Sequence, residues 1–118
     1  MTLIADAAVA LVALLHLYFL VLEMFLWTRP TGRRVFGLKP EFAEATKSLA
    51  ANQGLYNGFL AAGLVWGAVL GDRPIEMFFL GCVIIAGAFG AATVSRKILW
   101  VQAVPGLIAL GLVMATAP

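Results

Sequence analysis

The first 27 residues constrain the fold of this chain most strongly. A predominantly apolar run extends from Leu3 to Trp27 and carries His16 near its middle and Glu23 near its end. As a helix this run is about 37 Å long, enough to cross a bilayer with some tilt. Both ionisable side chains would then lie in lipid unless other segments covered them, because polar groups within a span are costly. The remaining chain is therefore predicted to pack around this helix.

The composition places the chain among integral membrane proteins. Of its 118 residues, 63% are hydrophobic and 12% are charged, whereas soluble domains are about half apolar and about a quarter charged. The net charge of +2 is too small to indicate nucleic-acid binding. The single cysteine, Cys82, offers no disulfide framework. We expect one domain over residues 1–118, with the lipid bilayer as its main partner.

Apolar runs and turn signals predict four spans, so the expected fold is an all-α, integral membrane four-helix bundle. The signals are Arg29-Pro30 after the first run, Gly71-Asp72-Arg73-Pro74, and Ser95-Arg96-Lys97. The second helix is expected to start near Pro40, ahead of its span. Pro105 is expected to free the carbonyl of Val101 and to kink the last helix. The predicted spans cover about residues 3–27, 49–70, 75–94 and 98–115.

Basic residues predict the orientation. Seven of the eight Lys and Arg residues lie in the connections after the first and third spans, and only Arg73 lies on the opposite side. The positive-inside rule then places both chain termini on the extracytoplasmic side. The first connection, residues 28–48, has an apolar middle between basic residues. It is interpreted either as a segment lying on the membrane surface or as a loop packed on the end of the bundle.

Polar side chains from three predicted helices fall at one depth, within about 12 Å of the cytoplasmic end of the spans. Glu23 would act as the acid/base or orienting carboxylate of a site there, and Tyr56 could donate a proton. Arg96 could reach Glu23 from the end of the third helix. The candidate catalytic residues are thus Glu23 and Tyr56, and the candidate ligand-binding residues are His16, Asn52, Gln53, Asn57, Gln102 and Arg96.

His16 and Glu23 are seven residues apart, which places them on one face of the first helix and about 10 Å apart along its axis. This separation disfavours one small metal ion bound by both side chains, and no metal site is predicted. The cofactor is left open. A polar track from the cytoplasm towards the middle of the membrane fits the spacing better, although His16 could also be a purely structural residue.

Glycines mark the surfaces along which these helices are expected to pack, because small residues allow membrane helices to approach closely. The expected packing positions are Gly54, Gly58, Gly63, Gly67 and Gly71 on the second helix, and Gly81, Gly87, Ala88, Ala91 and Ala92 on the third.

Three stretches resemble a known family. They read HLYFLVLEMFLWTRPTGRRVFGL, LAANQGLYNGFLAAGLVWG and TVSRKILWVQAVPGLIAL. Together they are similar to the small bacterial integral membrane proteins grouped as domain of unknown function thirteen-oh-four, and NQGLYNG is the most specific part. The resemblance covers nearly the whole chain. It implies a multi-pass protein of the bacterial inner membrane and supplies no activity.

Two wider resemblances carry functions. The stretch EATKSLAANQGLYN is weakly similar to the polar motif that begins helix two in the membrane-associated eicosanoid and glutathione metabolism superfamily, with Asn52 at the position of that motif's Asn. That superfamily tends to have an acidic residue where Tyr56 or Asn57 stands here. Glu23 loosely resembles the helix-one glutamate of the small multidrug resistance exporters, which alternates between proton and drug.

These observations leave three functional hypotheses. The first is a cytoplasm-facing site between helices one, two and four that binds a lipophilic or amphiphilic small molecule, with or without catalysis. The second is a proton-coupled transporter, acting as a homo-oligomer, with Glu23 and His16 along its path. The third is a structural membrane subunit without chemistry, in which the polar groups only hold helices together.

Overall fold

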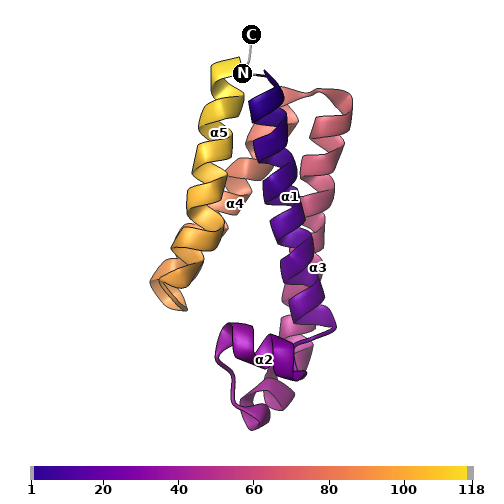
Figure 1. Ribbon diagram of the computed structural model, residues 1–118, viewed down its shortest axis with the longest axis vertical. Helices are drawn as coiled ribbons and strands as arrows, with labels where there is room; N and C mark the ends of the chain where they lie inside the picture. Colours follow the sequence, from indigo (N-terminus) through magenta and orange to yellow (C-terminus); the bar gives the residue numbers. More distant parts are fainter. Residues whose placement is uncertain (1, 117–118) are drawn as a thin grey trace. The chain divides into compact units, whose positions relative to one another are not determined.

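The computed structural model describes residues 2–116 and confirms an all-α chain. The chain consists of two compact units. Unit 1 contains the residues up to Leu14 and those from Leu60 onward, and unit 2 is Leu15–Phe59, so that the first and third helices contribute to both. The helices are α1 (Thr2–Met24), α2 (Pro30–Phe36), α3 (Pro40–Leu70), α4 (Arg73–Thr93), a π-helix (Leu99–Ala103) and α5 (Val104–Thr116) (Figure 1).

Local sequence signals explain where the helices begin and end. Pro30 occupies the first turn of α2, and Gly37 ends that helix in the left-handed conformation at φ 66°. Gly71 follows α3 with φ 64°. Asp72 then caps α4 by accepting a hydrogen bond from the backbone N–H of Ile75 at 3.1 Å.

The last predicted helix is interrupted where proline removes a backbone donor. The segment Leu99–Ala103 is π-helical, and α5 continues from Val104 with Pro105 as its second residue. A π-helical turn accommodates a break in the regular hydrogen-bond ladder, which Pro105 imposes because it cannot donate to Val101.

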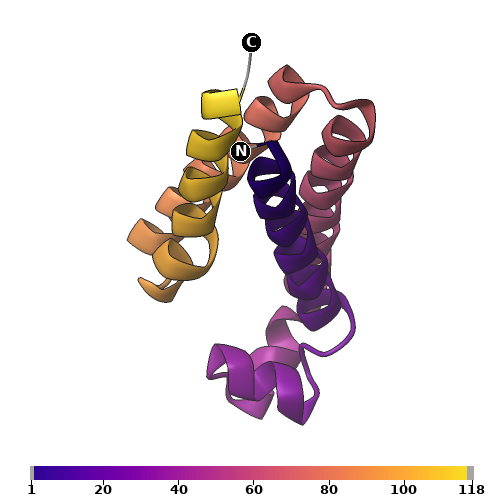
Figure 2. The ribbon, with the colours of Figure 1, turned by 45° about the horizontal axis from the view of Figure 1, so that its top comes forward.

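The core of unit 1 is built by four helical segments. Ala5, Val9 and Val12 lie on one face of α1 at helical spacing and are almost fully buried. The remaining buried members of the cluster, from α1, α3, α4 and α5, are Ala13, Leu64, Leu80, Val83, Ala109 and Val113. Figure 2 shows the first turn of α1, the last turn of α5 and the α3–α4 turn at the same end of this unit.

The glycine positions confirm most of the predicted packing surface. A Cβ placed on Gly58 would meet Leu20, and one on Gly63 would collide with the Phe79 ring. On α4, a Cβ on Gly87 would lie 2.8 Å from the backbone nitrogen of Ala103. The interpretation is wrong at two positions, since a Cβ would meet nothing within 4 Å at Gly71 or Gly81. Gly71 instead supplies the left-handed turn after α3.

Unit 2 joins the end of α1 to the start of α3 through α2. The indole Nε1 of Trp27 donates a hydrogen bond to Oγ1 of Thr46 at 3.0 Å, and its ring lies 4.9 Å from the ring of Phe36. Gly32 packs so closely on the Leu26 carbonyl that any side chain there would overlap it. These contacts fix the short helix α2 against the chain that leaves α1.

Three helices are long and apolar enough to cross a membrane: Thr2–Met24, Arg73–Thr93 and the combined segment Leu99–Thr116. The first ends three residues before Trp27, the predicted end of its span. Helix α3 is long enough at 31 residues, but polar residues such as Asn52, Gln53 and Asn57 make it less apolar. The span over residues 49–70 therefore stays a prediction.

Candidate functional site

The candidate site in unit 2 is centred on a contact between a carboxylate and an amide. Glu23 is the second-last residue of α1, and Asn57 lies on α3. The Nδ2 atom of Asn57 donates a hydrogen bond to Oε1 of Glu23 at 2.5 Å. Asn57 is buried, with 7% of its surface exposed, while Glu23 is half-buried. A hydrogen bond to an ionised acceptor is stronger than one between neutral groups.

Two glycines on α3 bring these side chains within reach. A Cβ on Gly54 would lie 3.2 Å from the Cβ of Glu23 and 2.6 Å from the Cγ of Met24. A Cβ on Gly58 would lie 2.8 Å from a methyl carbon of Leu20. Asn57 follows Gly54 by three residues, so it shares the packed face of α3. The absence of side chains at both glycines permits the close approach of α1 and α3 that the hydrogen bond needs.

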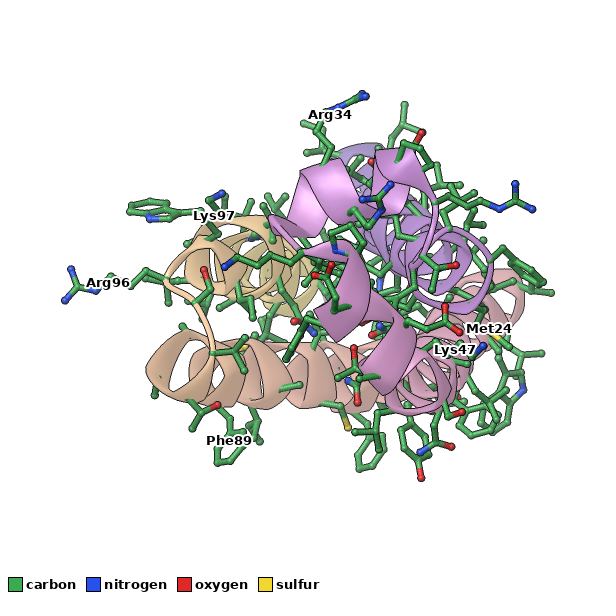
Figure 3. All side chains as sticks on the ribbon, turned by 90° about the horizontal axis from the view of Figure 1, so that it is seen from below. Met24, Arg34, Lys47, Phe89, Arg96 and Lys97 are labelled. Carbon is green, nitrogen blue, oxygen red and sulfur yellow. The ribbon has the colours of Figure 1, made fainter. Side chains whose placement is uncertain are left out.

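Glu23 also lines an open cavity of about 300 Å³. The cavity wall contains the charged side chains of Glu23 and Lys47 and the hydroxyl groups of Thr28 and Ser48. Its apolar part comes from Met24 and Phe25. Figure 3 shows Met24 and Lys47 on this part of the molecule. Its lining consists of Glu23, Met24, Phe25, Trp27, Thr28, Lys47, Ser48 and Ala51. A cavity with one apolar wall and several polar groups can hold an amphiphilic molecule.

His16 is fully buried in unit 2, at 0% exposure. The Phe19 ring lies edge-on to it, with the ring centroids 5.3 Å apart. Among residues 2–116, no group of three or more His, Cys, Asp or Glu side chains could hold a metal ion. The function of His16 in the site stays a prediction.

The other candidates on α3 are more exposed than Asn57. Asn52 and Gln53 are exposed. Tyr56 is 51% exposed and contacts Phe59, with the ring centroids 6.0 Å apart. Of the polar side chains proposed on this helix, Asn57 is the one that the structure brings to the carboxylate. The participation of Tyr56 as a proton donor therefore remains a hypothesis.

Two predicted site residues belong to unit 1. Gln102 lies in the π-helix and is half-buried. Arg96 lies in the turn after α4, is exposed, and extends outward in Figure 3. Their predicted grouping with Glu23 stays a prediction.

Unit 1 contains a polar cluster that our sequence analysis missed. Arg73 donates to Oε1 of Glu76 at 2.6 Å through Nη1, and its Nη2 lies 2.9 Å from Oδ1 of Asp6. Glu76 is fully buried, whereas 52% of the Asp6 side chain is exposed. Gly67 makes room for Glu76, since a Cβ there would lie 2.8 Å from its Cγ.

A signal for this cluster was present in the sequence. Asp6 and Glu76 are acidic residues inside two predicted spans, and Arg73 precedes Glu76 by three residues. Acidic residues within a span normally find a cationic partner. All three fall near the extracytoplasmic end of the predicted bundle, where Arg73 is the sole basic residue. The same reasoning that singled out Glu23 would have grouped them.

The helices and their buried polar pairs define an all-α protein with three candidate membrane-spanning helices. Comparison of the sequence with protein-family models confirms the family resemblance: residues 10–114 match the model described as "Protein of unknown function (DUF1304)", and the chain belongs to that family.

Among curated proteins, the chain is similar to "Uncharacterized protein YpaA" of Lactococcus lactis subsp. lactis (strain IL1403). The two are 31% identical over 114 residues, which cover 93% of this chain and 96% of that relative. No solved structure gives a significant match. The extent of both sequence matches shows that the family relationship involves almost the whole chain and not a single helix.

Proposed function

We propose that this chain is a multi-pass protein of the bacterial inner membrane that binds a small amphiphilic molecule carrying a protonated amine. The observation that carries the proposal is the Glu23 carboxylate, oriented by Asn57 and lining an open cavity. The carboxylate would accept hydrogen bonds from the amine, and Met24 and Phe25 would contact the alkyl part. Lys47, at the same cavity, is paired with Glu44, which leaves the Glu23 carboxylate as the charged group offered to the amine.

The proposed topology has four spans, with α3 crossing beside the three candidate helices and both termini outside. The common end of α1 and α5 in unit 1 supports this arrangement (Figure 1). The pairing of Arg73 with two carboxylates supports it too, because this ion cluster adds no net positive charge to the outer side. The seven other basic residues then favour the cytoplasmic side.

A binding experiment tests the site directly. The full-length protein with Trp66→Phe and Trp100→Phe retains Trp27, which lines the cavity, as its fluorophore. In phosphatidylcholine nanodiscs, decylamine should bind about tenfold more tightly than decanol, since a hydrogen bond to a charged group contributes about 1.5–3 kcal/mol. Glu23→Gln should abolish that preference while leaving the far-ultraviolet circular dichroism unchanged.

Glu41→Gln is the matched control, because Glu41 is an exposed carboxylate on the same helix as Asn57. It removes one negative charge and should leave the preference for decylamine intact. Equal binding of decylamine and decanol by the unsubstituted site, or equal loss of preference in both Gln variants, would show that Glu23 does not recognise the amine.

A proton-coupled transporter, acting as a homo-oligomer, is the second candidate, favoured by the complete burial of His16 within the candidate membrane helix that also carries Glu23. Ionisable residues inside spans commonly mark ion pathways. In proteoliposomes, an imposed proton gradient should drive the accumulation of ethidium, a fluorescent cation. The proton gradient should dissipate as ethidium accumulates. Accumulation that persists in the combined His16→Ala and Glu23→Gln variant excludes the predicted path.

A further inference from the structure

The segment around α2 carries a concentrated positive charge. Residues 29–39 contain Arg29, Arg33, Arg34 and Lys39 and no acidic residue. Arg29, Arg34 and Lys39 are exposed. In contrast, Lys47 is paired with Glu44 on the same helix, with Nζ 2.5 Å from Oε1. The charge of α2 and its flanks is thus available to an external partner.

This charge is held close to the end of a candidate membrane span. Helix α1 ends at Met24, and α2 begins at Pro30, so five residues join them. Five residues reach at most about 18 Å when fully extended. Leu26 lies two residues beyond the end of α1, and Gly32 of α2 packs closely on its carbonyl. This contact holds α2 nearer to the end of α1 than the extended limit. With α1 across a membrane, the segment would lie at the boundary between hydrocarbon and water.

Apolar side chains accompany the cations. Val35 is 43% exposed, Phe36 is 39% exposed and Phe42 is 55% exposed. Figure 3 shows Arg34 extending outward from α2. Within the described part of the chain, Nε of Arg33 is buried and has no hydrogen-bond partner. Cations mixed with aromatic and aliphatic side chains are typical of surfaces that rest at the headgroup level of a bilayer.

We propose that these residues form a docking surface for the headgroups of anionic phospholipids. The basic surface is defined by Arg29, Arg34, Val35, Lys39 and Phe42. Its cations would pair with lipid phosphates, and its apolar side chains would enter the region between headgroups and acyl chains. Charge complementarity selects anionic over zwitterionic lipid, because each basic residue near an anionic membrane surface strengthens binding by roughly fivefold.

Trp27 reports on this surface because its ring packs on Phe36 of α2. The full-length protein with Trp66→Phe and Trp100→Phe, in dodecyl maltoside micelles, is titrated with short-chain phosphatidylglycerol or phosphatidylcholine. Phosphatidylglycerol should change Trp27 emission to saturation, and phosphatidylcholine should not. Arg29→Gln with Arg34→Gln should raise the phosphatidylglycerol midpoint by about 25-fold, the product of two such factors.

The matched control is Arg96→Gln with Lys97→Gln, which removes two exposed basic residues from another part of the chain. It should shift the midpoint of the Trp27 signal less than about threefold, because Trp27 packs on α2 and reports lipid bound there, and Glu23→Gln should leave it unchanged, which separates this surface from the amine site. Three results would each overturn the proposal: an equal response to phosphatidylcholine, an equal shift in the control pair, or saturation by inorganic phosphate alone.

Discussion

Two glutamates pack against α3, and their partners differ. In unit 2, Glu23 is half-buried, accepts from the neutral amide of Asn57 and lines an open cavity. In unit 1, Glu76 is fully buried and faces the guanidinium of Arg73, which also pairs with Asp6. A cation neutralises Glu76, whereas an amide only orients Glu23. Glu76 is thus both more deeply buried and paired with a cation, whereas Glu23 keeps a partly exposed carboxylate beside a neutral partner.

Replacing Arg73 with Gln is expected to have the largest effect. It leaves the fully buried Glu76 without its cation, and breaking a buried ion pair costs about 3–5 kcal/mol. Unfolding in increasing proportions of a denaturing detergent, followed by circular dichroism, measures the loss of stability. Arg73→Gln combined with Glu76→Gln should recover much of it. Stability unchanged in the single variant would remove the structural function assigned to this pair.

Asn57→Leu should have the next largest effect, a loss of about 1–3 kcal/mol in the free energy of unfolding, because it leaves the Glu23 carboxylate without its amide donor. Combined Glu23→Leu and Asn57→Leu should cost less than the sum of the two single changes, which the same unfolding experiment measures. Simple additivity would mean that the two side chains are not coupled.

Glycine substitutions compare the close contacts behind the two glutamates. Gly54→Ala places a methyl group against Glu23 and Met24, and Gly67→Ala places one against Glu76. Each should cost about 1–3 kcal/mol, the range for overpacking. Gly81→Ala, where nothing lies within 4 Å, is the matched control and should stabilise its helix slightly. If all three variants unfold alike, close packing does not hold the glutamates in place.

Asp6→Asn should have the smallest effect, since half of the Asp6 side chain is exposed and Arg73 keeps its bond to Glu76. Exposed ion pairs contribute about 0–1 kcal/mol. The expected loss is within that range and should diminish in high salt. A loss as large as that of Arg73→Gln would instead make Asp6 the principal partner of the cation.

Depth in the membrane narrowed the possible partners of Glu23 to a few amides but could not select Asn57 among them. Counting residues placed Glu23 level with the amides of Asn52, Gln53 and Asn57, but did not show which amide faces it. A clue is available in the glycines, since Asn57 lies one turn after Gly54 on the packed face of α3. The cluster of Asp6, Arg73 and Glu76 was not predicted, because Arg73 was interpreted only as a marker of membrane orientation.

The sequence alone determined the all-α class, the family and three of the four predicted segments apolar enough to cross a membrane. These properties depend on local backbone preferences and on hydropathy, both of which are carried by neighbouring residues. The tertiary structure decided that Glu23 meets Asn57 and that Glu76 meets Arg73. Those pairings depend on how each helix is rotated about its axis and how closely it approaches the next, which the glycine contacts between helices set.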